Sequence, residues 1–126
     1  MTKLVAYRDT IEYLLSHSPH PTTWTICTGS QGDLATHPLP AMTQGALFSL
    51  CTGAARENEN TTVRFNEIYL SFRVEVDDLA AEHGVTKSSD FAKVYEMVLA
   101  NERVRSSRVR VDDVADLEGL KWQKKF

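Results

Sequence analysis

The sequence offers one pair of side chains suited to moving a proton. Asp33 and His37 lie four residues apart in a segment that also contains Gly32 and Pro38, which is typical of a loop. The pKa of a histidine lies near neutrality, so the pair could donate and accept a proton in an isomerisation, cyclisation or elimination. An ordinary turn explains the same residues, because aspartate after glycine and a solvated histidine beside proline are common there.

The cysteines and the other histidines form no further catalytic or metal-binding constellation in the sequence. Cys27 lies in a strand-like segment and Cys51 on a helical apolar stripe, where a cysteine acts as a small hydrophobic residue. Their spacing fits neither a metal site nor a disulfide framework. His17 and His20 have the spacing of a metal-binding pair, but the sequence shows no third ligand. We therefore expect no metal.

Length and charge exclude several classes of function. The chain has 126 residues, with 14 lysines and arginines against 17 aspartates and glutamates. This size supports one domain with one core. A chain without basic excess has no electrostatic footprint for nucleic acid. The apolar runs are too short to span a membrane or to form a secretory signal, so we expect a cytoplasmic protein.

Apolar residues recur at helical spacing in four segments and at strand spacing in three. The predicted helices are 3–16, 42–59, 77–83 and one that begins at Ser88 or Ser89. The predicted strands are 22–28, 63–74 and 107–111. We expect residues 4–112 to form the domain and residues 113–126 to be a partly ordered tail.

The alternation of helices and strands predicts an α/β fold. Strands joined by helical crossovers form a parallel sheet with right-handed connections, here of about three strands, which is half of a Rossmann fold. In so small a sheet the first strand lies at an edge, and exposed edges need covering. We expect a second copy of the chain to complete the structure.

Four segments, taken in order, resemble the C-terminal half of the short-chain dehydrogenase/reductase family. AYRDTIEYLL (6–15) resembles the family's fourth helix, and WTICTGSQG (24–32) the strand that ends in the catalytic serine. QGALFSL (44–50), running into AARE (54–57), is similar to the active-site helix. VRFNEIY (63–69) is close to the next strand, where an Arg-Val-Asn run is usual.

The chain departs from this family at the catalytic residues. When the active-site helices are aligned, Pro40 and Gln44 stand at the two positions of the family's Tyr-x-x-x-Lys pair, and residues 14–68 contain neither tyrosine nor lysine. The glycine-rich turn that holds a dinucleotide pyrophosphate is also missing, since GSQG (29–32) has another spacing. We therefore expect no cofactor, and no hydride transfer by this chain alone.

The resemblance implies a pocket beyond the carboxyl ends of the strands. A small organic molecule would bind there, with Asp33 and His37 as the catalytic pair and with Ser30, Gln31, Gln44, Tyr69 and Arg73 as the substrate-binding residues. Arg73 could bind a carboxylate or phosphate with two hydrogen bonds, while an ion pair with Glu75 is the structural alternative.

The resemblance also implies a partner. In the family, the fourth helix and the active-site helix pair with their copies in a neighbouring subunit. Helices 3–16 and 42–59 therefore predict a homodimer whose apolar centre would contain Leu4, Ile11, Leu47 and Leu50. Two alternatives stay open. The chain could be a non-catalytic partner of a full-length reductase, or a fragment of an NAD(P)-dependent reductase.

Overall fold

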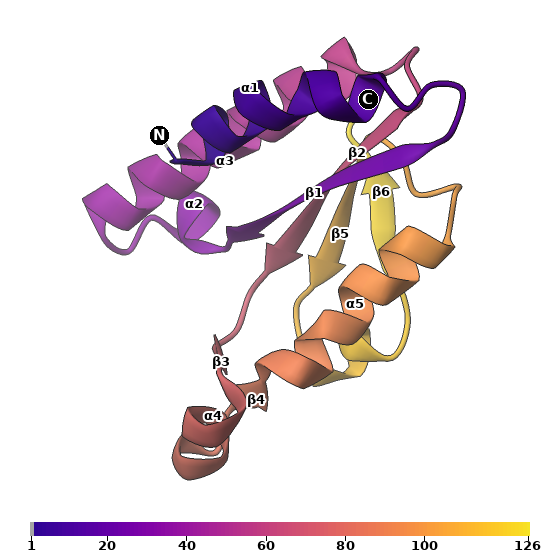
Figure 1. The fold of residues 1–126 in the computed structure, drawn as a ribbon. Helices are drawn as coiled ribbons and strands as arrows, with labels where there is room; N and C mark the ends of the chain where they lie inside the picture. The colour runs from indigo at the N-terminus through magenta and orange to yellow at the C-terminus, as the bar shows by residue number, and fades with distance from the viewer. Residues whose placement is uncertain (1) are drawn as a thin grey trace.

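The computed structural model describes residues 2–126, with helices on both faces of a central sheet (Figure 1). The sheet has the order β1-β2-β5-β6. Its strands are β1 (Thr22–Gly29), β2 (Val63–Leu70), β5 (Ser107–Val111) and β6 (Trp122–Lys124). The first three are parallel, and β6 runs antiparallel to β5. The predicted α/β fold with a small parallel sheet is confirmed, and β1 lies at its edge.

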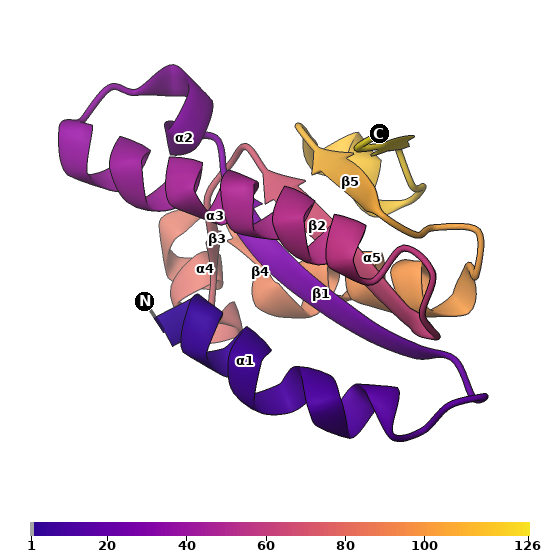
Figure 2. The ribbon, with the colours of Figure 1, turned by 90° about the horizontal axis from the view of Figure 1, so that it is seen from above.

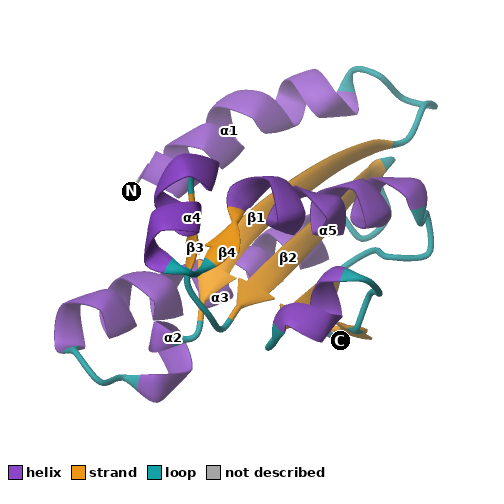
Figure 3. Cartoon of the chain, turned by 90° about the horizontal axis from the view of Figure 1, so that it is seen from below, coloured by secondary structure: helices purple, strands orange, loops and turns teal. Residues whose placement is uncertain are grey.

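The helices are divided between the two faces of the sheet. One face carries α1 (Thr2–Leu15), α2 (Gln31–Leu34) and α3 (Pro38–Glu57), which lie on the viewer's side of the sheet in Figure 2. The other face carries α4 (Asp77–His83) and α5 (Ser88–Ala100), seen from below in Figure 3. A second small sheet pairs β3 (Val74–Glu75) with β4 (Thr86–Lys87). Within residues 2–126, no helix is both long and apolar enough to cross a membrane.

Two element boundaries differ from those expected. The helix predicted over 42–59 begins at Pro38, because a proline in the first turn needs no hydrogen-bond donor and already has a helical φ. The strand predicted over 63–74 ends at Leu70. There the next backbone amide, that of Ser71, donates to Val111 O at 3.0 Å, and the chain then leaves the sheet.

Residues 113–126 are part of the fold rather than a partly ordered tail. Asp113 caps a short 3-10 helix, η1 (Val114–Leu117), by accepting a hydrogen bond from the Ala115 amide at 2.9 Å. β6 then pairs with β5, and Trp122 packs against the apolar cluster beneath the sheet. Strand β6 was not predicted, because it has only three residues and two of them are polar.

The alternation of side chains along the strands creates two apolar clusters. Ile68 and Val109 face α5, where they pack with Val94 and Val98. The opposite face packs under α1 and α3, and its buried residues are Tyr7, Ile26, Cys51, Ala54, Ala55 and Phe65. Sheet residues at alternate positions lie on opposite faces, so the strand sequences account for both layers.

Helix α1 is held to the sheet by aromatic residues. Tyr7 is its buried residue, and the Tyr7 hydroxyl donates to the Glu57 carboxylate and accepts a hydrogen bond from Asn58. Trp24 stacks on Phe65, with 5.0 Å between the ring centres. The Trp24 indole nitrogen donates to the Thr10 hydroxyl of α1 at 2.9 Å, so hydrogen bonds of Tyr7 and Trp24 give α1 a defined position on β1.

A fully buried carboxylate joins the strands of the main sheet. Glu67 lies in β2 and is 0% exposed. It accepts hydrogen bonds from the Thr28 hydroxyl of β1 at 2.6 Å and from Arg108 Nε of β5 at 3.1 Å. Lys125, directly after β6, forms an ion pair with Oε2 of the same carboxylate, the oxygen that Arg108 Nε also contacts. We call these four residues the Glu67 cluster.

Two arginines bind the carboxyl ends of α3 and α5. Arg64 of β2 donates to the carbonyls of Val98 and Leu99 in α5 at 3.2 and 3.1 Å. Arg105 precedes β5 and donates to the Asn58 and Thr61 carbonyls after α3. Helix-terminal carbonyls otherwise lack partners, so these guanidinium groups fix both helices at the amino ends of the strands.

Replacing the buried carboxylate should destabilise the fold strongly. Glu67→Gln keeps the shape but leaves the Arg108 and Lys125 charges without their counterion, which should lower the free energy of unfolding by about 3 kcal/mol. Urea denaturation measures the change. Glu96→Gln, at an exposed position of α5, serves as the control and should stay within about 0.5 kcal/mol. Equal stability of the two variants would contradict a structural role for the Glu67 cluster.

Candidate functional site

An open groove of about 460 Å³ lies at the carboxyl ends of β1 and β2. Four of the predicted substrate-binding residues line it, namely Ser30, Gln31, Gln44 and Arg73. The other lining residues are Cys27, Thr28, Gly29, Pro40, Leu70, Ser71 and Phe72. Parallel strands end here at one edge, and their loops bring distant residues together. We call this cavity the carboxyl-edge groove.

Gln44 connects the two sides of the carboxyl-edge groove. Its side-chain oxygen accepts a hydrogen bond from the Gly29 amide at 2.8 Å, which ties α3 to the end of β1. The amide nitrogen of Gln44 keeps its two donor hydrogens for another partner. Gln44 stands where the resemblance places a lysine, so a neutral donor replaces a cation in this chain.

Arg73 extends from the rim of the groove. Its side chain is 66% exposed and forms an ion pair with Glu75, which was the structural alternative. His83 Nδ1 lies 2.7 Å from another oxygen of Glu75. These contacts, first the hydrogen bond with His83, hold the pKa of Glu75 below its ordinary value. Arg73 is therefore oriented by Glu75 while most of its guanidinium faces solvent.

Tyr69 lies on the α3 face of the sheet rather than in the lining of the groove. It is 3% exposed, and its neighbour in β2, Leu70, lines the groove instead. Burial raises the pKa of Tyr69, and the adjacent Asp33 carboxylate raises it further. The Tyr69 hydroxyl therefore stays protonated around neutral pH and can donate a hydrogen bond towards Asp33.

Asp33 and His37 take different partners. Asp33 lies in α2 beside Tyr69, whereas His37 is the exposed residue before α3. Nδ1 of His37 lies 3.2 Å from the Thr36 hydroxyl, and this hydroxyl donates to Gln31 at 2.6 Å. Among the hydrogen bonds and ion pairs described for residues 2–126, none joins Asp33 to His37. Their joint role in catalysis stays a prediction.

Cys27 also lines the groove, and its environment argues against a nucleophilic role. Burial raises the pKa of its thiol, so the reactive thiolate is disfavoured. Cys27 and Cys51 are both free thiols. In the part of the chain that the structure describes, no group of three His, Cys, Asp or Glu side chains could hold a metal ion.

A second hollow of about 570 Å³ adjoins the groove and shares Phe72 and Arg73 with it. Asp112, which follows β5, lines this hollow and accepts a hydrogen bond from the Ser71 hydroxyl at 3.0 Å. The Arg110 guanidinium, and then Lys121, hold the pKa of Asp112 well below its ordinary value. Sequence analysis missed Asp112, although an acidic residue directly after a parallel strand is itself a signal for this edge.

The turn after β1 does not fit a dinucleotide pyrophosphate. Its Gly29 amide donates to Gln44, and its Ser30 amide donates to Leu70 O at 3.2 Å. A Cβ atom on Gly32 would overlap the ring of Phe48 in α3, so this glycine permits the packing of α2 against α3. Two of the backbone donors that a phosphate would need in this turn are therefore already used.

Comparison with known proteins supplies one relative, the short-chain dehydrogenase/reductase iacG from Pestalotiopsis fici, which is 49% identical over 129 residues. The resemblance to the short-chain dehydrogenase/reductases is thereby confirmed. The alignment covers 98% of this chain and 52% of the relative. This reductase-related chain thus spans about half the length of the curated relative that it matches. No family model and no solved structure matches it.

A methyl group at Gly32 should destabilise the reductase-related chain. Because Phe48 packs against Arg108 and Tyr69, its ring cannot move freely, and Gly32→Ala should lower the free energy of unfolding by about 1–2 kcal/mol. Gly53→Ala is the matched control, because that position in α3 has open space and helical alanine is favoured by about 0.5–1 kcal/mol. Thermal or urea unfolding should show opposite signs, and a shared sign would refute the packing role of Gly32.

Proposed function

We propose that the reductase-related chain binds a small organic molecule in the carboxyl-edge groove. The observation that carries this proposal is the convergence of Ser30, Gln44 and Arg73 on one groove from three separate segments. A concave site with few polar groups and an apolar wall is the usual form of a ligand site. Leu70 and Phe72 supply that wall.

The lining indicates the class of molecule. The exposed Arg73 guanidinium suits a carboxylate or phosphate group, because a planar fork of donors binds two oxygens at once. The Gln44 amide and the Ser30 hydroxyl suit a carbonyl or hydroxyl. The ligand proposed is therefore a small acid with an apolar part and at least one further oxygen.

The chemistry proposed is a non-redox rearrangement without a cofactor. Two features of the chain support this: residues 14–68 lack the tyrosine and lysine that the family uses, and the Gly29 and Ser30 amides after β1 already have acceptors within the chain. Asp33 and His37 lie in the segment that joins the groove residues Gln31 and Pro40. They are proposed to move a proton in an isomerisation or cyclisation, once substrate has brought their side chains towards the groove.

Measurements of binding test the ligand site in the groove, and measurements of turnover test the proposed rearrangement. A library of small organic acids is titrated against the chain, and binding is measured by NMR. Arg73→Gln should weaken binding of these acids about ten-fold, because the charge-assisted hydrogen bonds between the guanidinium and the ligand's acid group are lost. Arg103→Gln, an exposed arginine in the loop after α5, should leave the affinity unchanged. Asp33→Asn and His37→Ala should retain binding and lower the turnover of any rearranged ligand.

Three outcomes would count against the proposal. Equal affinity in the Arg73 and Arg103 variants would remove the groove from ligand binding. Unchanged turnover in the Asp33 and His37 variants would remove their catalytic role. Stabilisation of this chain by NADPH, read as a rise in melting temperature, would favour the alternative of an NAD(P)-dependent reductase fragment, since bound ligand stabilises the folded state.

We also infer that the helices α1 and α3 form the interface of a homodimer. An apolar groove of about 270 Å³ lies between them, lined by Leu4, Met42, Thr43, Ala46, Leu47 and Leu50. Met42 is 67% exposed and Leu4 is 48% exposed, so this surface costs free energy in water. Pairing of the equivalent helices in the resembled family supports a second copy as the occupant. A full-length reductase is the alternative.

A charge placed in this apolar groove should prevent dimer formation. Met42→Glu would bury a carboxylate without a partner, so it should weaken the dimer by about 2 kcal/mol or roughly 30-fold in Kd. Leu99→Glu is the control, because Leu99 is 59% exposed on α5, on the other face. Light scattering after size-exclusion chromatography gives the mass. A wild-type monomer would overturn the homodimer and direct attention to the reductase partner.

A further inference from the structure

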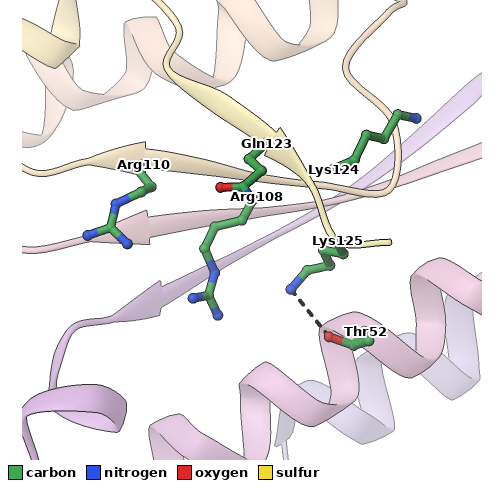
Figure 4. Close-up of a pocket in the computed structure, with 6 residues that line it drawn as sticks. All are labelled: Thr52, Arg108, Arg110, Gln123, Lys124 and Lys125. Carbon is green, nitrogen blue, oxygen red and sulfur yellow. Dashed lines mark hydrogen bonds between the residues drawn. The ribbon is translucent and has the colours of Figure 1, made fainter.

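A basic cavity of about 240 Å³ lies beside α3, apart from the carboxyl-edge groove (Figure 4). Its lining residues are Thr52, Arg108, Arg110, Gln123, Lys124 and Lys125. α3 packs over β1 and β2, so the β5–β6 half of this sheet face carries the side chains that line the cavity. Figure 4 shows Arg108, Arg110 and Gln123 on the sheet face that carries α3, while Lys124 points away from it.

The Glu67 cluster leaves one positive charge in excess at this cavity. Arg108 and Lys125 are both bound to the single carboxylate of Glu67. The Lys125 side chain is 7% exposed and that of Arg108 is 25% exposed, so neither cation is fully hydrated. A partly buried charge without a counterion is unfavourable, and an anion in the cavity would compensate it.

The cavity also orients its donors. Arg108 lies 4.5 Å from the centre of the Phe48 ring and 5.0 Å from that of Tyr69, which fixes the plane of its guanidinium. Its Nε and Nη2 face Glu67, so Nη1 is left for another acceptor. Arg110 lies 4.7 Å from the same Tyr69 ring.

Acidic groups near the cavity are already engaged. Asp112 receives two hydrogen bonds from Arg110, at 3.0 and 2.8 Å, and a third contact from Lys121. Asp33 lies beside the Tyr69 hydroxyl. The charges of Asp112 and Asp33 offset those of Arg110 and Lys121. Arg108 and Lys125, by contrast, share the single negative charge of Glu67.

We propose that this basic cavity binds a small oxyanion, a carboxylate or phosphate group. Nη1 of Arg108, the Lys125 ammonium, the Gln123 amide and the free edge of Arg110 supply its donors. The volume suits one such group with a short substituent rather than a nucleotide. The site is independent of the carboxyl-edge groove and adds a second ligand to the chain.

Calorimetric titration of the whole chain with inorganic phosphate and with succinate, at low chloride, tests this site and distinguishes the two anion chemistries. Gln123→Glu keeps the size of the side chain, puts a negative charge in the cavity and should weaken binding about ten-fold. Lys125→Met removes the excess charge and should weaken it at least as much. Arg103→Gln lowers the net charge equally at a distant exposed position and should leave the affinity unchanged.

NMR of the arginine side chains provides the location. Binding should shift the Nε–H signals of Arg108 and Arg110 and leave that of Arg103 in place. If Lys125→Met fails to fold, Gln123→Glu decides the outcome, because its side chain is exposed. If neither phosphate nor succinate binds, the proposal is overturned. Equal weakening of binding by Gln123→Glu and Arg103→Gln would also overturn it, because the affinity would then depend only on the net charge of the chain.

Discussion

The burial of Glu67 in the middle of the sheet is the constraint on which the rest of the structure depends. A carboxylate without water needs donors on every side, and here these come from β1, β5 and the residue after β6. The face towards α3 is apolar around Ile26 and Phe65 and becomes polar from Glu67 towards β5 and β6. The opposite face forms an apolar layer with α5, and its buried charge, Arg64, is satisfied by carbonyls at the end of that helix.

This division places two different surfaces on one small chain. At the carboxyl ends of the strands, loops bring together polar and apolar side chains in a groove, as expected for a relative of the short-chain dehydrogenase/reductases. Beside α3, the sheet itself presents cations. The first surface combines the strand ends, the start of α3 and the loops between them, whereas the second lies mainly on β5 and β6. Ligands at these two places would therefore contact different parts of the molecule.

The sequence predicted what depends on local pattern. The predicted helices 3–16 and 77–83 match α1 and α4 to within one residue at each end, and Ser30, Gln31, Gln44 and Arg73 line one groove at the carboxyl edge. It failed where tertiary packing decides. Glu67 is one acid in an otherwise ordinary strand, and its partners are 39 or more residues away. The place of Tyr69 beside Asp33 depends on how α2 packs against the sheet, which no spacing in the sequence specifies.

The two arginine-bound helix ends lie at the amino ends of the strands, opposite the carboxyl-edge groove. The anchoring of α3 and α5 is thus physically remote from the loops that would recognise a ligand. Insertions and exchanges in those loops can accumulate without loosening the anchors. Evolution, or an engineer, can consequently diversify recognition at one end of this domain while the other end maintains its architecture.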